Sequence, residues 1–487
     1  MSWLKKNNSK LFWLFLAVLF TYVNSLNNEF VSDDVFAIVN NPKLGDFGEV
    51  FKNPFYFLRP LEYWVVSNLF GKQPEYFRLI NFVFHLLTVW GVYALVPLVS
   101  FAKVKKQTKL SFKSEDVGLV AALILSVHPL GAEVVNWISA GPYVQVAGLA
   151  IWSLVFFLLA IKGEEKYYVW SLVLMLLALF TMERAVVITG LMFMFVWLLG
   201  KLKEKWKYLI IPGLLSLVWL GVSVLGVGAR TESLQVNYYN DTGSVDFLRQ
   251  LPVSISEYLK LFVWPVELTL YHSDLLFNNW QFGLRAVVLL GLLGSIVWMF
   301  FKNRQIFFWL SWFLICLSPT LLPLGLSWVV AERYVYLAMI GLCVVVAMGF
   351  VSLKQKWGSD GAIFLLVLLV AGMMFRTVLR NNDWQTADNL YLSAERYSTL
   401  SPQNHNNLGD IYGRQRKLNL SRDHFLRAIE LNPRYADAMH NLGNTYIQMG
   451  EIEKAKESFE QAIKNNPNLW QSERALKAIE EWERKNL

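Results

Sequence analysis

The chain has only two cysteines among 487 residues, Cys316 and Cys343, and both lie within long apolar stretches. The sequence therefore predicts no disulfide framework. Charged residues are also scarce, at 17% of the chain, whereas hydrophobic residues make up 55%, which is above their usual share in soluble domains. This composition excludes an ordinary soluble globular protein and predicts a protein that crosses a membrane several times.

Eleven apolar stretches, several of them near the length of a bilayer crossing, precede residue 381. We expect them to be membrane-spanning helices, so that residues 1–380 form an all-α, polytopic membrane domain with about eleven spans. The stretches are residues 11–26, 78–101, 117–127, 143–161, 168–182, 185–200, 208–228, 283–301, 306–326, 334–352 and 360–379.

Lysine and arginine residues set the expected orientation, because they gather in every second connection between the apolar stretches. This pattern places the N-terminus inside and the C-terminus outside, with residues 11–26 as an uncleaved anchor rather than a signal peptide. The basic inner loops account for the net charge of +8, which therefore indicates no nucleic-acid partner. Segment 251–264 is the weak point: it could lie in the interface, and a crossing there would invert everything that follows.

From residue 381 the composition becomes that of a soluble protein, and a repeat of 34 residues begins. The period, with small residues where helices touch and a proline after the second helix, is typical of tetratricopeptide repeats. We expect residues 381–487 to form an α-solenoid of these repeats outside the membrane, ending in a capping helix near 471–484. The matched positions are Leu408, Gly409, Tyr412, Ser421, Phe425, Ala428 and Pro433, followed by Leu442, Gly443, Tyr446, Ala455, Phe459, Ala462 and Pro467.

Such arrays present a concave face to peptides, so the repeats imply a protein or peptide partner, either a substrate or another subunit. Asn407, Asn441, Asn444 and Arg434 are candidates to bind a backbone or a carboxylate, although such asparagines are more often plain solvated surface.

Polar clusters fall on the expected outer side of the membrane, where ionisable residues are functional candidates. Because all of them lie on one side, we expect them to converge on one outer cavity. Structural explanations compete with this, such as a capped helix end at His128 or a neutralised pair at Glu183. The clusters are Asp33 with Asp34, then Arg59, then His128 with Glu133, then Glu183 with Arg184, and Glu332 with Arg333 and Tyr334.

A carboxylate base beside cations that can hold phosphate suits the transfer of a sugar from a lipid phosphate. The acceptor hydroxyl loses a proton to the carboxylate as it attacks, and arginine stabilises the departing phosphate. We expect Asp33 and Asp34 to act in catalysis, Arg59 and His128 to bind donor phosphate, and Glu133, Glu183, Glu332 and Tyr334 to support them. A divalent cation, Mg²⁺ or Mn²⁺, stays open as a cofactor, because Asp33, Asp34 and Glu183 offer oxygen ligands, but no spacing requires one.

The ordered set of motifs resembles the transmembrane and tetratricopeptide-repeat-containing O-mannosyltransferases and their bacterial relatives, which are polyprenyl-phosphate-sugar-dependent glycosyltransferases of the GT-C class. The likeness covers nearly the whole chain. The motifs that carry it are the acid pair after the first span, Arg59-Pro60-Leu61, His128-Pro129 with Glu133, Ser318-Pro319-Thr320 with Pro323, Glu332-Arg333-Tyr334, and Asn381 to Trp384 before the repeats.

The resemblance implies that Asp33 is the base, that Asp34 supports it, and that Arg333 faces the donor phosphate. It also implies a polyprenyl-phosphate sugar as donor and a hydroxyl on an exported protein as acceptor. Two motifs depart from the family: the relatives' charged Ser-Gly-Arg-x-Asp stretch is here 139–143 without charge, and their Lys-Glu is here Met182-Glu183, followed by Arg184.

Two other readings remain open. A non-catalytic membrane scaffold would recruit partners through the repeats and use the outer clusters only for structure, and the lost cations favour it. A transporter fits less well, since the charges gather at one face rather than at mid-membrane. Short loops and few repeats favour a bacterial inner membrane, with the endoplasmic reticulum as the alternative.

Overall fold

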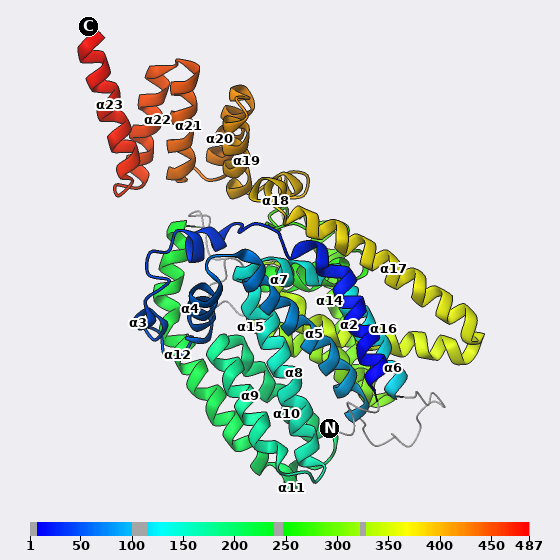
Figure 1. Cartoon of the computed structure of the whole chain (residues 1–487). Helices are drawn as coiled ribbons and strands as arrows, with labels where there is room; N and C mark the ends of the chain where they lie inside the picture. The colour runs from blue at the N-terminus through cyan, green and yellow to red at the C-terminus, as the bar shows by residue number, and fades with distance from the viewer. Residues whose placement is uncertain (1–6, 100–113, 238–246, 276, 322–327, 487) are drawn as a thin grey trace. The chain divides into compact units, whose positions relative to one another are not determined.

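The computed structural model describes residues 7–99, 114–237, 247–275, 277–321 and 328–486, and every regular element in these ranges is helical. Each predicted apolar stretch contains or overlaps a helix (Figure 1). The elements up to the last apolar stretch are α2 (Asn8–Tyr22), η1 (Val23–Ser25), η2 (Val35–Val39), α3 (Phe47–Val50), α4 (Leu58–Phe70), α5 (Pro74–Leu98), α6 (Ser114–Val127), η3 (Pro129–Gly131), α7 (Ala132–Asn136), η4 (Ile138–Ala140), α8 (Gly141–Ile161), α9 (Tyr167–Thr181), η5 (Glu183–Val186), α10 (Val187–Leu198), α11 (Leu202–Lys205), α12 (Lys207–Asn237), α13 (Phe247–Val263), α14 (Asn279–Lys302), α15 (Arg304–Leu321), α16 (Glu332–Trp357) and α17 (Ser359–Asp383).

The chain divides into two compact units. The first, here the membrane unit, comprises the described residues within Met1–Thr231, Val245–Val266 and Asn278–Ala387. The second, the repeat unit, comprises those within Glu232–Ser244, Glu267–Phe277 and Asp388–Leu487. The helices of the C-terminal region are α18 (Ala387–Ala394), α19 (Pro402–Arg414), α20 (Leu418–Leu431), α21 (Ala436–Met449), α22 (Ile452–Asn465) and α23 (Trp470–Asn486).

Six described helices are long and apolar enough to cross a membrane, and a seventh crossing results if α6 and the following 129–136 segment, bent by 60°, are one span. The protein is a multi-pass membrane protein, and the count of about eleven crossings stays a prediction. Pro129 lies at the bend. Because proline has no backbone N–H to donate, the helix cannot continue unbroken through this position. The break brings the polar residues of η3 and α7 to the end of an apolar helix.

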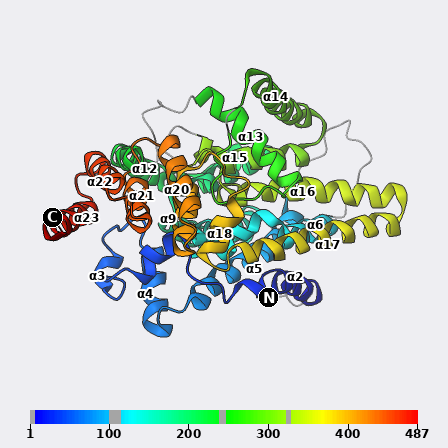
Figure 2. The ribbon, with the colours of Figure 1, turned by 90° about the horizontal axis from the view of Figure 1, so that it is seen from above.

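The six helices differ in what surrounds them. Within their apolar windows, 67% to 78% of α5, α8 and α16 is buried in protein, against 11% to 17% of α12, α14 and α17. Figure 2 shows α14 at the edge of the helical unit. Large apolar faces without protein cover suit lipid contact. The membrane unit thus has an inner group of helices that carries the site and outer helices suited to face lipid.

The repeat unit packs as the sequence predicts, with α19 against α20 and α21 against α22. The small residues lie under aromatic rings: a Cβ on Gly409 would be 2.7 Å from the Phe425 ring, and one on Gly443 would be 2.6 Å from the Phe459 ring. The terminal helix α23 contributes buried Ile479 to the same core. The 34-residue spacing therefore reports close helix contacts.

We predict that Gly409→Ala destabilises the repeat unit, because the added methyl group displaces the buried Phe425 ring. Overpacking of this kind costs about 1–3 kcal/mol, partly offset by the better helix propensity of alanine. Gly413→Ala, in the same helix, is the matched control, since its Cβ would meet nothing nearer than Ser421 Oγ at 3.2 Å. Thermal unfolding should show a lower melting temperature for Gly409→Ala than for Gly413→Ala; equal values would contradict the packing account.

Candidate functional site

The two aspartates after α2 differ sharply in environment. Asp34 is fully buried and accepts a hydrogen bond of 2.8 Å from the Ser139 backbone N–H at η4. Asp33 is exposed. Ser32, just before the pair, has φ of 54°, a left-handed conformation that is uncommon outside glycine. The local turn therefore anchors one carboxylate inside the protein and presents the other outward.

Burial raises the pKa of Asp34 to about 6, although the hydrogen bonds from Ser139 and the charge of Arg78 act to lower it. The carboxylate thus changes charge within about one pH unit of neutrality rather than near pH 4. No such shift accompanies an ordinary solvated acid in a loop.

Arg78, at the start of α5, holds the loop that carries this acid pair. Its Nε donates to the Asn136 carbonyl at 2.8 Å, and its Nη1 donates to the carbonyls of Leu26 at 2.9 Å and Asn28 at 2.7 Å. Its Nη2 donates to the Glu29 carbonyl at 3.0 Å. The side chain is fully buried. One guanidinium therefore fastens the segment before the acids to the end of α7.

Asn381, near the end of α17, makes a second set of ties around the same place. It accepts a hydrogen bond of 2.7 Å from Asn136 Nδ2 and donates to the Thr21 carbonyl at 2.7 Å and to Asn24 Oδ1 at 2.9 Å. The ends of α2, α7 and α17 are thereby joined. This gives a physical role to the Asn381 motif that the sequence singled out.

A cavity of about 610 Å³ lies in the membrane unit, and its walls include the loop after the acid pair, α4, the start of α8 and the turn between α9 and α10. It brings together Arg59 and the predicted cluster of Glu183 with Arg184. Arg59 Nε donates to Tyr63 Oη at 3.0 Å. The residues that line the cavity are Ala37, Asn41, Lys43, Leu44, Asp46, Glu49, Val50, Tyr56, Arg59, Pro60, Tyr63, Pro142, Tyr143, Thr181, Met182, Glu183 and Arg184.

Charges near Arg59 connect the cavity to the acid loop. Burial lowers the pKa of Arg59, but Tyr63 and the carboxylate of Asp34 outweigh this effect and raise it overall. Glu62, which the sequence reading missed, accepts a hydrogen bond of 2.6 Å from Gln145 Nε2. Burial raises the pKa of Glu62 to about 7, against the lowering effects of that hydrogen bond and of Arg59.

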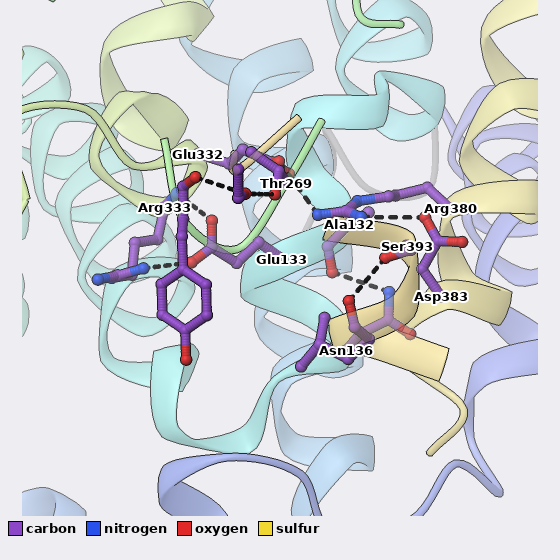
Figure 3. Close-up of polar contacts among 12 residues, drawn as sticks. Ala132, Glu133, Asn136, Thr269, Glu332, Arg333, Arg380, Asp383 and Ser393 are labelled. Carbon is purple, nitrogen blue, oxygen red and sulfur yellow. Dashed lines mark hydrogen bonds and ion pairs between the residues drawn. The ribbon is translucent and has the colours of Figure 1, made fainter. Parts of the chain in front are cut away.

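Both charged residues of the Glu332-Arg333-Tyr334 motif form ion pairs with other residues of the protein. Arg333 pairs with Glu133, through its Nη1 at 2.5 Å and through its backbone N–H at 3.0 Å (Figure 3). Glu332 pairs with Arg380 at 3.2 Å, and Arg380 pairs with Asp383 at 2.9 Å. The structure therefore brings Glu133 and Arg333 together as a buried ion pair, and the predicted contact of Arg333 with donor phosphate stays a prediction.

Cations and aromatic rings alternate from this pair toward the cavity. Arg333 lies 5.1 Å from the Trp137 ring and 5.0 Å from the Tyr334 ring. On the cavity side, Arg184 lies 4.2 Å from the Tyr334 ring and 4.9 Å from the Tyr143 ring. Each contact is within cation–π range. We call these five residues the cation–aromatic stack.

His128 is fully buried, and both of its ring nitrogens have partners. Nδ1 accepts from the Leu130 N–H at 3.2 Å, and Nε2 lies 3.1 Å from the Phe262 carbonyl oxygen. These contacts fit a neutral ring that caps the break after α6, and the prediction that His128 binds phosphate stays a prediction. Among the described residues no group of three or more His, Cys, Asp or Glu side chains could hold a metal ion.

Sequence reasoning missed Arg78 and Glu62. The available signal was an ionisable residue beside or within an apolar helix, which is costly without a partner. Arg78 stands at the first position of the stretch 78–101, and Glu62 follows Arg59-Pro60-Leu61 directly.

Comparison with known proteins shows similarity along most of the chain. The protein O-mannosyl-transferase F38B6.6 of Caenorhabditis elegans is 22% identical over 85% of this chain and 61% of its own length. The protein O-mannosyl-transferase TMTC4 of Mus musculus is 25% identical over 82% of this chain and 64% of its own length. This chain is a homologue of the protein O-mannosyl-transferases. The resemblance predicted from the sequence is confirmed.

More local matches agree. The protein O-mannosyl-transferase Tmtc2 of Drosophila melanogaster is 35% identical over 24% of this chain and 12% of its own length. The tetratricopeptide repeat model matches residues 400–468, which confirms the repeats. The chain spans less than two thirds of each of these three relatives. No solved structure matches the chain.

We predict that Asp34 makes stability depend on pH between about 4 and 6. With a folded-state pKa of about 6 and an ordinary value of 3.8, the folded protein binds more protons than the unfolded chain in this window. Stability therefore falls as pH rises through it, by roughly 3 kcal/mol in all. Asp34→Asn removes the titration and keeps an oxygen to accept from Ser139.

The measurement is the melting temperature of the purified protein in detergent from pH 4 to 7. The wild type should lose stability relative to Asp34→Asn as pH rises. A difference between the two proteins that stays constant over this range would contradict the placement of Asp34.

Proposed function

We propose that this chain is an integral membrane glycosyltransferase that moves a sugar from a polyprenyl-phosphate donor to a hydroxyl on an exported protein, at the outer face of the membrane. Its homology to proteins named protein O-mannosyl-transferases supports the reaction class. The observation that carries the proposal is the position of Arg59, which lines the cavity and lies near enough to Asp34 to respond to its charge. Arg59 thus lies near the acid pair that includes the proposed base.

In the proposed reaction, the exposed carboxylate of Asp33 takes the proton of the acceptor hydroxyl as its oxygen attacks the anomeric carbon. The bond between that carbon and the phosphate oxygen breaks, and the leaving lipid phosphate gains negative charge. Arg59 stabilises this charge. Asp34 acts as a positioning residue, because its hydrogen bond to Ser139 fixes the turn that presents Asp33.

The remaining predicted site residues enter the proposal through the cation–aromatic stack. Glu133 holds Arg333, and Arg333 packs against Tyr334, which in turn lies against Arg184. Glu332 holds Arg380 beside the same segment. Glu183 lines the cavity, where it adds a carboxylate next to the donor. His128 caps the bend after α6.

The proposed acceptor site is in the repeat unit, on the outer side of the membrane. A groove of about 580 Å³ runs between the first helices of the two repeats and includes Arg414, Asn441 and Asn444 in its walls. Amide and guanidinium groups in such a groove suit a peptide backbone. A bacterial inner membrane fits the short loops best.

A non-catalytic scaffold is the second candidate, and one observation favours it: the charges of Glu133, Arg333, Glu332 and Arg380 are paired within the protein. A scaffold needs these pairs for stability alone. It needs no acid at position 33.

We therefore predict that Asp33→Asn abolishes most sugar transfer while leaving folding and donor binding intact. Loss of a general base lowers turnover by about 10²–10⁴-fold. The assay follows transfer of mannose from a polyprenyl-phosphate mannose to a secreted protein acceptor. Glu29→Gln is the matched control, since Glu29 is an exposed acid on the same loop. Full turnover by Asp33→Asn, or no transfer by the wild type with any such donor, would sink the catalytic proposal.

A further inference from the structure

Arg184 stands out among the arginines of the membrane unit. Arg78 binds four carbonyls, Arg333 binds Glu133, and Arg380 binds Glu332 and Asp383. Arg184 forms no hydrogen bond or ion pair with any residue that the structure describes, and its Nη1 is fully buried. A guanidinium has five N–H donors, and burying one without a partner is costly. A bound acceptor group would satisfy the Nη1 donors of Arg184.

Two tyrosine rings of the cation–aromatic stack contact this group. Tyr143 and Tyr334 lie at 4.9 Å and 4.2 Å from the guanidinium carbon of Arg184, and their own rings are 5.8 Å apart. Contacts with aromatic faces use the face of the guanidinium and leave the N–H groups at its edge free to donate. The arginine is therefore held in place without its hydrogen-bonding capacity being used.

The surroundings select a negatively charged ligand. Arg59 lines the same cavity, which gives two guanidinium groups on its walls. Two of the three acids in the cavity have other partners: Asp46 accepts from the Gly48 N–H at 2.8 Å, and Glu49 pairs with Lys52 at 2.7 Å. The third, Glu183, is the acid whose charge acts on Arg184. Two arginines that share a cavity suit a phosphate group, which guanidinium binds through paired hydrogen bonds.

We propose that Arg184, which packs against Tyr143 and Tyr334, binds the phosphate group of a lipid phosphate in this cavity, with Arg59 as the second cation. This rests on the proposed function for the identity of the ligand as the lipid-linked donor. The phosphate remains bound to Arg184 while the sugar leaves, so the residue contacts donor and lipid-phosphate product alike.

The test measures binding of farnesyl phosphate to the purified full-length protein in detergent, with farnesol and inorganic phosphate as the comparison ligands. Arg184→Gln should weaken farnesyl phosphate binding roughly ten- to hundredfold, as expected for loss of hydrogen bonds to a charged group. It should leave farnesol binding unchanged. Arg184→Lys keeps the positive charge but lacks the paired N–H donors of arginine. Its affinity for farnesyl phosphate should therefore lie between those of the wild type and Arg184→Gln.

Lys43→Gln is the matched control, because Lys43 lines the same cavity but is exposed and pairs with Glu49 at 3.5 Å. It should bind farnesyl phosphate nearly as well as the wild type. Equal losses in Lys43→Gln and Arg184→Gln would reduce the effect to general charge and overturn the proposal. Wild-type affinity in Arg184→Lys and Arg184→Gln would overturn it as well.

Two further outcomes keep this proposal separate from the proposed function. Displacement of farnesyl phosphate by an equal concentration of inorganic phosphate would show a free-phosphate site and contradict the lipid ligand. If the wild type transfers no sugar but Arg184→Gln abolishes farnesyl phosphate binding, the binding site is supported and the proposed glycosyltransferase activity is contradicted. If the wild type transfers sugar and Arg184→Gln leaves both the rate and the KM for donor unchanged, the activity is supported and the proposed binding site is contradicted.

Discussion

The hydrogen bonds of the Arg78 guanidinium to four backbone carbonyls are the interaction on which the candidate site depends. They join the segment Leu26–Glu29, just before the acid pair, to the end of α7. A loop of polar backbone next to a membrane domain has many groups to satisfy, and a single rigid fork of donors satisfies four of them. The four carbonyl oxygens replace the water that the guanidinium loses on burial, and this offsets the cost of its desolvation. The position of the acid pair therefore depends on this anchor.

The cation–aromatic stack connects the buried Glu133–Arg333 pair to the cavity wall. A buried ion pair between Glu133 and Arg333 is weak evidence for stability by itself, because desolvation offsets much of the attraction. Its geometry has another consequence here: it holds Arg333 against one side of Tyr334, whose ring also contacts Arg184. Arg333, which the sequence assigns to the donor phosphate, thus packs behind the cavity, whereas Arg184 lines it.

The sequence predicts much of the fold because its signals are local. Apolar runs such as 283–301 correspond to helices such as α14, and the 34-residue spacing of Gly409 and Gly443 corresponds to two packed helix pairs. The predicted site is harder, since its pairings are long-range. Glu133 and Arg333 are 200 residues apart, and nothing in either segment reveals the other. Arg59 and Arg184 meet in one cavity because α4 packs against α9, which ends just before the turn that carries Arg184.

The central claim is that Arg59 of α4 and Arg184 of the turn after α9 form one site for a lipid phosphate. A cryo-electron microscopy map of the purified protein with a bound polyprenyl phosphate tests it most directly. The account predicts phosphate density in the cavity, within hydrogen-bonding distance of both Arg59 and Arg184. Phosphate density elsewhere in the membrane unit, with these two arginines contacting only protein or solvent, would contradict it.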